Sequence, residues 1–146
     1  MLNYVADEFI STYRMRQVEH DREQFVATLA LMAEELAELQ AEVEADNFDK
    51  LAAFGEALDM IYVTAQRLRN MGFDVDAGLL EVHRSNLTKT VPLSAAKVQL
   101  ELARERYPDA YVEESQNYAV IRCGVTGKVI KPTTYTQKHL TNDMVA

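Results

Sequence analysis

The chain has 146 residues, of which 48% are apolar and 26% charged, and its net charge at pH 7 is −8. This length suits a single domain with a hydrophobic core, and no segment approaches the ~18 consecutive apolar residues of a transmembrane helix. An acidic chain is a poor general binder of nucleic acid or of anionic membranes, so we expect neither as a partner. The one cysteine, Cys123, cannot form an internal disulfide, and the N-terminus lacks the pattern of a secretion signal, so we expect a cytoplasmic protein.

Apolar residues at helical spacing predict two helices in the first third of the chain. The first covers about residues 2–17. Asp21 and Gln24 resemble a capping box that opens the second helix, which runs to about residue 45. Steps of three and four along the second helix predict a core stripe. Its members are Phe25, Leu29, Met32, Leu36, Leu39 and Val43.

A third helix is expected over about residues 48–71, with Asp46 or Asn47 as its N-cap. Gly72 is placed to stop this helix and Asp74 to start a fourth. The fourth helix would reach Thr90, close to Pro92. The predicted core stripe of the third helix consists of Leu51, Phe54, Leu58, Ile61, Tyr62, Ala65 and Leu68.

The character of the sequence changes after Pro92. A short helix is expected over residues 94–106, followed by a strand at 118–123, a turn at 124–127 and a returning strand at 128–131. An isolated hairpin is marginal in water, so it must pack on the helices or on another subunit. Residues 138–146 are expected to be a loose tail. The predicted fold is therefore mainly α: one domain with a helical core over about residues 2–91 and a C-terminal helix and β-hairpin over about 94–135.

Two pairs of acidic residues have the same spacing on the second and third helices. Glu35 and Glu38 are three residues apart, and so are Glu56 and Asp59. Residues three apart share a helix face, and if the two helices are antiparallel neighbours the pairs converge. Two unit charges ~4 Å apart repel by about 4 kcal/mol at an effective dielectric near 20. Such a cluster needs a cation, and hard ions such as Mg²⁺ suit carboxylate oxygens best.

A second interpretation of these carboxylates stays open. Glu is a good helix former, and acidic runs usually mark a solvated helix face. Under that interpretation the chain is a non-catalytic helical dimerisation module, which would bind Mg²⁺ weakly and show no turnover.

Three motifs resemble the all-α nucleoside triphosphate pyrophosphohydrolases, the superfamily of MazG and phosphoribosyl-ATP pyrophosphohydrolase. The first is E-E-x-x-E followed by E-x-x-D, which begins here at Glu34 and ends at Asp59. The second is E-V-H-R-S-N-L-T-K at 81–89, with Leu87 where the superfamily usually has Met. The third is G-K-V-I-K-P at 127–132, which is similar to small bacterial and phage-encoded members. The resemblance implies a MazG-like antiparallel helical bundle, and host cytoplasm as the location if the chain is phage-encoded.

The resemblance also implies the reaction and its residues. The chain would hydrolyse a nucleoside triphosphate between its α- and β-phosphates, giving the monophosphate and pyrophosphate. Two or more Mg²⁺ ions, or Mn²⁺, would be held at Glu35, Glu38, Glu56 and Asp59. Glu34 would lie close to the second metal or to the attacking water, so Glu34 and Glu35 are the catalytic candidates. Such metal ions can clamp phosphate oxygens and generate hydroxide from water.

Five cationic or polar residues are candidates for phosphate contacts. Asn86 and Lys89 share one face of the fourth helix. Arg84 is equally suited to a salt bridge between subunits. Lys128 and Lys131 are weaker candidates, because residues three apart do not share a face of a regular strand.

The remaining alternatives concern substrate and assembly. We expect deoxynucleotides as substrates. Purines are slightly favoured because phage-type relatives often act on purine nucleotides, and this last step is analogy alone. Hydrolysis of phosphoribosyl-ATP is the alternative reaction. Wide apolar stripes and a hairpin that needs a partner surface predict a homodimer or a dimer of dimers.

Overall fold

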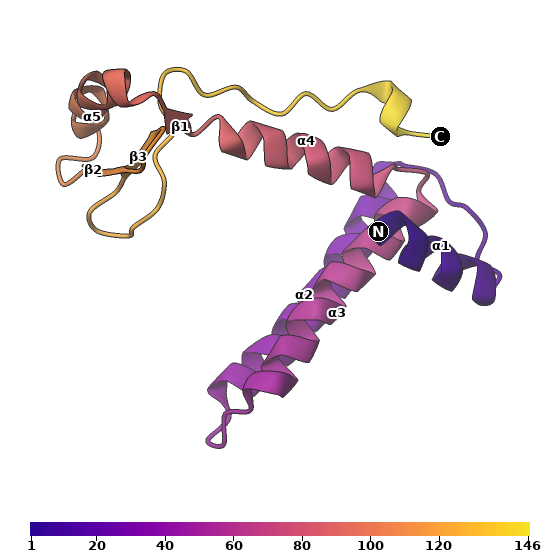
Figure 1. The fold of residues 1–146 in the computed structure, drawn as a ribbon. Coiled ribbons are helices and arrows are strands. Elements are labelled where there is room, and N and C mark those ends of the chain that lie inside the picture. Colours follow the sequence, from indigo (N-terminus) through magenta and orange to yellow (C-terminus); the bar gives the residue numbers. More distant parts are fainter. The chain divides into compact units, whose positions relative to one another are not determined.

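The computed structural model describes all 146 residues and divides into two compact units. The first unit contains residues 1–79 and 141–146, and the second contains residues 80–140. Figure 1 labels their elements, and each unit is described by itself. The prediction of a mainly α fold is confirmed. No helix is both long enough and apolar enough to cross a membrane.

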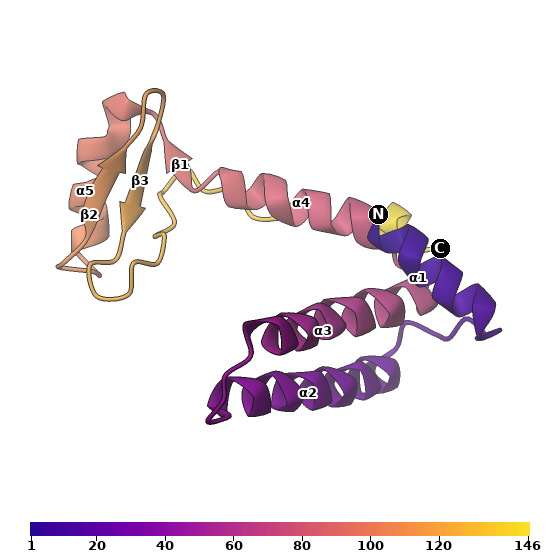
Figure 2. The ribbon, with the colours of Figure 1, turned by 60° about the horizontal axis from the view of Figure 1, so that its bottom comes forward.

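Three helices form most of the first unit. They are α1 (Leu2–Thr12), α2 (Arg22–Glu44) and α3 (Lys50–Asn70). The helices α2 and α3 lie side by side and antiparallel, joined by a short loop, and α1 packs on α3 (Figures 1 and 2). This antiparallel pair is the arrangement that the convergence of the acidic pairs requires.

The N-cap predicted for α2 is confirmed, and the N-cap predicted for α3 is not. Asp21 caps α2 as predicted, because its carboxylate accepts the backbone N–H of Gln24 at 3.0 Å. The N-cap of α3 is Asp49, which accepts the N–H of Leu51 at 2.8 Å. The prediction of Asp46 or Asn47 as the cap was therefore wrong, and α3 starts two residues later than expected.

The first helix ends earlier than its periodicity predicted. It stops at Thr12, and Arg14 adopts a left-handed conformation with φ 51°. A left-handed residue after the last turn terminates a helix. The end of α3 follows the prediction, because Gly72 has φ 88° and its N–H bonds the carbonyl of Arg69 at 2.9 Å. A side chain at Gly72 would be strained by that φ and would also approach Gln17 within 2.9 Å.

The helix α4 (Val75–Leu87) begins in the first unit, where it is capped from two sides. Asp74 accepts the N–H of Ala77 at 2.9 Å, as predicted for a helix start. The Oδ1 of Asn3 accepts the N–H of Val75 at 2.9 Å, and Asp76 in turn accepts the N–H of Leu2 at 2.9 Å. The starts of α1 and α4 therefore cap each other.

The last residues are not a loose tail. The N–H of Asp74 bonds the carbonyl of Met144 at 2.8 Å, and the N–H of Ala146 bonds the carbonyl of Gly72 at 2.8 Å. Phe73 and Val145 form an antiparallel bridge between these bonds. The N–H of Asp74 and the carbonyl of Gly72 pair with the C-terminal segment and not with a helix. The prediction of a loose tail at 138–146 was wrong for this reason.

The second unit holds a three-stranded antiparallel sheet in the order β1-β3-β2, beside the helix α5 (Figure 2). The elements are β1 (Thr90–Val91), the short 3-10 helix Leu93–Ala95, α5 (Ala96–Arg104), β2 (Tyr111–Glu114) and β3 (Ala119–Arg122). Val91, Ala96 and Ala119 are buried together as its core.

Two predictions for this unit were wrong. Thr90 lies in β1, opposite Val120, and not at the end of a helix. The hairpin that forms joins β2 to β3, with Val112 opposite Ile121. The predicted return strand at 128–131 contributes a single bridge, between Val129 and Arg122. It runs beside β3 only briefly, because β1 pairs with the other half of β3.

Candidate functional site

The apolar stripes of α2 and α3 do not form the core of the first unit. Most of their large residues are between 41% and 70% exposed: Phe25, Leu29, Leu36, Val43, Leu51, Phe54, Leu58 and Ile61. Ala65 is buried as predicted, while Met32, Leu39 and Leu68 are half-buried. Two helices bury only the seam between them, so a stripe turned away from that seam stays exposed. The predicted core stripe was wrong in this respect.

The seam between α2 and α3 carries polar side chains, and their contacts fix its register. The guanidinium of Arg67 donates to Gln24 Oε1 at 2.8 Å and lies 3.5 Å from Thr28 Oγ1. Glu35 lies seven residues after Thr28 on α2, about 10 Å along the helix at 1.5 Å per residue. Eight residues back along α3 from Arg67 stands Asp59, so the antiparallel register brings Glu35 level with Asp59.

Three of the predicted metal-binding carboxylates meet at this position. Glu35, Glu38 and Glu56 each offer an oxygen atom, and these oxygens lie within 4.8 Å of one another. Glu35 and Glu56 are half-buried in the seam, and Glu38 is exposed at its edge. Asp59 is exposed and close enough for its charge to act on both Glu35 and Glu56. The four residues are called the acidic cluster below.

The pKa values of two carboxyl groups in the acidic cluster are raised. Burial, and then the charges of Glu38, Asp59 and Glu34, raise the pKa of Glu35 above its usual 4.5. Burial, and then Glu38 through its charge and a shared hydrogen bond, raise the pKa of Glu56. A raised carboxyl pKa means that the negative form is disfavoured. A proton or a cation therefore relieves the cluster.

The donor set fits a hard divalent cation. It consists of carboxylate oxygens alone, without histidine or cysteine, which is the chemistry that Mg²⁺ and Mn²⁺ accept. Glu34 is exposed and acts on Glu35 by its charge, but its oxygen is not among the three that converge. Glu42 was not predicted from the sequence, and its charge contributes to the raised pKa of Glu56. Glu42 lies one turn beyond Glu38 on the same face of α2, and that spacing could have identified it.

The predicted phosphate contacts lie in the second unit. The Nζ of Lys89 donates to Asn86 Oδ1 at 2.6 Å. The prediction that both residues lie on one face of the fourth helix was wrong, because α4 ends at Leu87 and Lys89 lies in the turn that follows. Arg84 and Lys128 are exposed and form no ion pair with an acidic residue of the chain. The Nζ of Lys131 lies 4.6 Å from the ring centroid of Tyr135, a cation–π contact.

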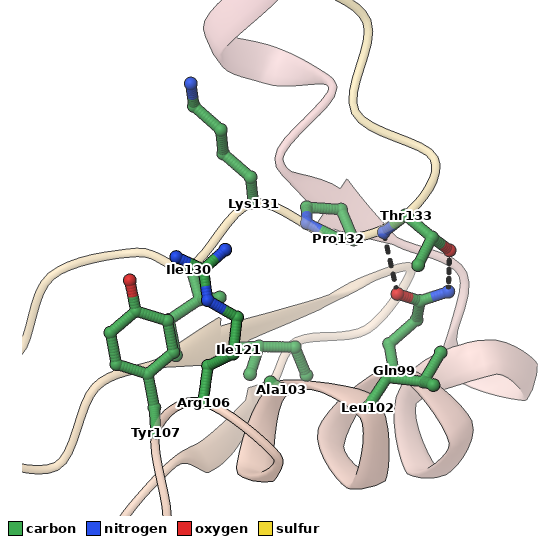
Figure 3. A pocket seen from close by; sticks show the side chains of 10 residues that line it. All are labelled: Gln99, Leu102, Ala103, Arg106, Tyr107, Ile121, Ile130, Lys131, Pro132 and Thr133. Carbon is green, nitrogen blue, oxygen red and sulfur yellow. Dashed lines mark hydrogen bonds between the residues drawn. The ribbon is translucent and has the colours of Figure 1, made fainter.

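A pocket of about 180 Å³ is present in the second unit, and Lys131 is one of its lining residues (Figure 3). Gln99 closes one end of it by donating to Thr133 Oγ1 at 2.6 Å and accepting the N–H of Thr133 at 2.9 Å. Figure 3 shows the Lys131 side chain directed away from Arg106 and Tyr107. Lys131 therefore borders this pocket without filling it. The other lining residues are Leu102, Ala103, Ile121, Ile130 and Pro132.

Comparisons with known proteins identify the family through its sequence model. Searches of curated proteins and of solved structures gave no match. The model of one family, described as phosphoribosyl-ATP pyrophosphohydrolase, matches residues 5–86. That range contains the whole acidic cluster and ends at Asn86. The chain therefore belongs to the phosphoribosyl-ATP pyrophosphohydrolase family, a metal-dependent pyrophosphohydrolase type within the MazG-like all-α superfamily.

Proposed function

We propose that this chain hydrolyses a nucleoside triphosphate between its α- and β-phosphates, releasing the monophosphate and pyrophosphate. The observation that carries the proposal is the convergence of Glu35, Glu38 and Glu56 within 4.8 Å, inside the range matched by the family. Glu35, Glu38, Glu56 and Asp59 would hold two or more Mg²⁺ ions, or Mn²⁺. When bound, these ions would supply charge neutralisation of the phosphates and a lowered pKa for a bound water.

The residues of the chain then have distinct roles. Phosphoryl transfer depends on alignment and charge neutralisation more than on covalent catalysis. Glu34 and Glu35 would lie beside the attacking water, where a carboxylate can orient it and accept its proton. The hydroxide oxygen bonds to the α-phosphorus as the bond to the bridging oxygen breaks. Pyrophosphate leaves with that bridging oxygen and its electron pair.

Two substrate classes remain candidates, and each has its own support. A deoxynucleoside triphosphate, with purines slightly favoured, is supported by the likeness of the G-K-V-I-K-P segment to phage-type members. Phosphoribosyl-ATP is supported by the description of the matching family. Incubating a panel of nucleotides and phosphoribosyl-ATP with Mg²⁺ tests both classes, provided that pyrophosphate and monophosphate are both measured. Release of inorganic phosphate and a diphosphate would contradict the proposed bond.

We further propose that the chain acts as a homodimer or a dimer of dimers. The support is the exposed apolar face of α2 and α3, since a contiguous apolar face of this kind usually marks an interface. Leu36 and Leu58 on this face are 53% and 45% exposed. We expect Leu58→Asp to reduce the sedimentation coefficient of the assembly. A wild type that sediments as a compact monomer at micromolar concentration would contradict the proposal.

A further inference from the structure

The pocket of the second unit is lined by α5, by β3 and by the segment 130–133 (Figure 3). Its volume is about 180 Å³. Since an apolar cavity of about 150 Å³ holds a benzene molecule, this pocket has room for one ring with one small substituent. Its aliphatic lining residues are Leu102, Ala103, Ile121, Ile130 and Pro132. All of its lining residues lie beyond residues 5–86, the range that the family model matches.

Hydrogen bonds hold the segment 130–133 at both of its ends. The N–H of Ile130 bonds the carbonyl of Ile121 on β3 at 2.8 Å. At the other end, the N–H and the hydroxyl group of Thr133 both bond the side-chain amide of Gln99 on α5. Gln99 is only 8% exposed, so this attachment is buried. The segment is therefore fixed to β3 and to α5, and the pocket that these attachments line is formed before any ligand binds.

The end of the pocket opposite Gln99 carries a guanidinium group without an acidic partner. Arg106 is exposed, and it takes part in none of the three ion pairs of the structure. Its Cζ lies 5.9 Å from the ring centroid of Tyr107, and Figure 3 shows the two side chains together at this end. The N–H groups of Arg106 and Tyr107 both bond the carbonyl of Ala103, at 3.2 and 2.9 Å. The backbone that carries the guanidinium is therefore held in place.

A single available cation favours a ligand with a single negative charge. Lys131 also lines the pocket, but its side chain is directed away from Arg106 and Tyr107 (Figure 3). A guanidinium presents its N–H donors in one plane, and a carboxylate accepts two of them in parallel. One guanidinium would leave most of the charge of a polyphosphate unpaired, in a chain whose net charge is already −8. The charge at the pocket therefore suits a monocarboxylate.

From these contacts we propose that the pocket binds a small aromatic monocarboxylate, with its ring among the aliphatic side chains and its carboxylate on Arg106. The ring of Tyr107 gives the ligand ring an aromatic neighbour. The amide of Gln99 is already bonded to Thr133, so Arg106 is the group that orients the ligand. An apolar pocket with one well-placed polar group is typical of a small-molecule site. This site belongs to the second unit alone and is independent of the acidic cluster.

Titration of benzoate into the isotopically labelled full-length chain, followed by amide NMR, tests the site. A ligand of this size should bind with a Kd on the order of 1 mM, and the amide signals of Ile130 and Thr133 should shift. Benzamide has the same ring without the charge, so it should bind roughly two- to fivefold more weakly. Phenyl phosphate that binds more tightly than benzoate would overturn the assignment of a carboxylate ligand. A wild type whose pocket signals do not shift with benzoate would overturn the site.

Two variants separate the charge from the cavity, and the same spectra show whether each variant is folded. Arg106→Gln should weaken benzoate binding by roughly two- to fivefold and leave benzamide binding unchanged. Ala103→Leu places a larger side chain in the pocket and should abolish the binding of both ligands. Lys97→Gln makes a matched charge change on α5, outside the pocket, and should bind benzoate as the wild type does. An Arg106→Gln protein that keeps the benzoate affinity of the wild type would overturn the proposal, and so would a folded Ala103→Leu protein that binds both ligands normally.

Discussion

Glu38→Gln gives the sharpest test of the acidic cluster. Glu38 is the neighbour whose charge contributes most to the raised pKa of both Glu35 and Glu56. The substitution keeps the size of the side chain and removes one of the four negative charges. A lost charge relieves repulsion in the metal-free protein, so its stability should stay equal or rise. The same loss removes a metal ligand, so Mg²⁺ binding and turnover should fall together.

The size of the effect follows from linkage between binding and folding. At a Mg²⁺ concentration a hundred times its Kd, binding stabilises the wild type by about 2.7 kcal/mol. A variant whose Kd is a hundred times higher gains about 0.4 kcal/mol at the same concentration. For a chain of 146 residues, one kcal/mol shifts Tm by roughly 4 °C. Mg²⁺ should therefore raise Tm by about 10 °C in the wild type and by about 2 °C in Glu38→Gln.

Thermal unfolding with and without Mg²⁺, beside turnover of the same samples, makes this measurement. Glu23→Gln is the matched control, because Glu23 is an exposed residue in the first turn of α2 and outside the acidic cluster. That control should keep both the Mg²⁺ response and the turnover of the wild type. A Glu38→Gln protein that stays active, or that gains as much Tm from Mg²⁺ as the wild type, would refute the metal site. A large loss of metal-free stability would indicate a structural glutamate instead.

Three further predictions test the electrostatics and the helix ends. The pKa values of Glu35 and Glu56 in the folded protein are raised above 4.5, so at pH values just above 4.5 the folded state binds more protons than the unfolded state. The stability of the metal-free protein should therefore fall as the pH rises through the raised pKa values. A series of Tm measurements against pH should show this fall without Mg²⁺ and should not show it at saturating Mg²⁺. Asn3→Ala should cost about 1 kcal/mol in urea unfolding, because Asn3 caps α4; an unchanged midpoint would contradict the mutual caps. Gly72→Ala should cost on the order of 1–2 kcal/mol by the same assay, because φ is 88° there.

Local chemistry made several element boundaries predictable. Asp21, Gly72 and Asp74 each act through atoms within three residues along the chain, so a sequence pattern is enough to place them. The cap of α3 was misplaced because Asp46 and Asp49 both precede the helix, and the local rule does not choose between them. Arg14 has no pattern that predicts a left-handed residue.

Pairing in the sheet could not be predicted from local patterns. Thr90 pairs with Val120, thirty residues further along the chain, and this contact converts the expected end of a helix into β1. The turn at 124–127 is real, since the N–H of Cys123 bonds the carbonyl of Lys128 at 2.9 Å. The strand after that turn nevertheless remains short, because which strand pairs with β3 depends on the whole unit. The turn residues predict that the chain reverses direction, but they do not predict which strand pairs with β3.

Helical periodicity identified the apolar faces of α2 and α3, but it did not show how little of each face the helix pair buries. The period shows that Glu35 and Leu36 point in different directions, and it does not show which direction meets the neighbouring helix. Repulsion among the carboxylates argues against burying their face, yet the structure places Glu35 and Glu56 half-buried in the seam and Leu36 outside it. A helix pair with half-buried carboxylates in its seam and an exposed apolar face is incomplete by itself. A divalent cation would neutralise the carboxylates in the seam, and a second copy of the chain would cover the apolar face. The proposals of a metal site and of a homodimer therefore account for two features of the same helix pair.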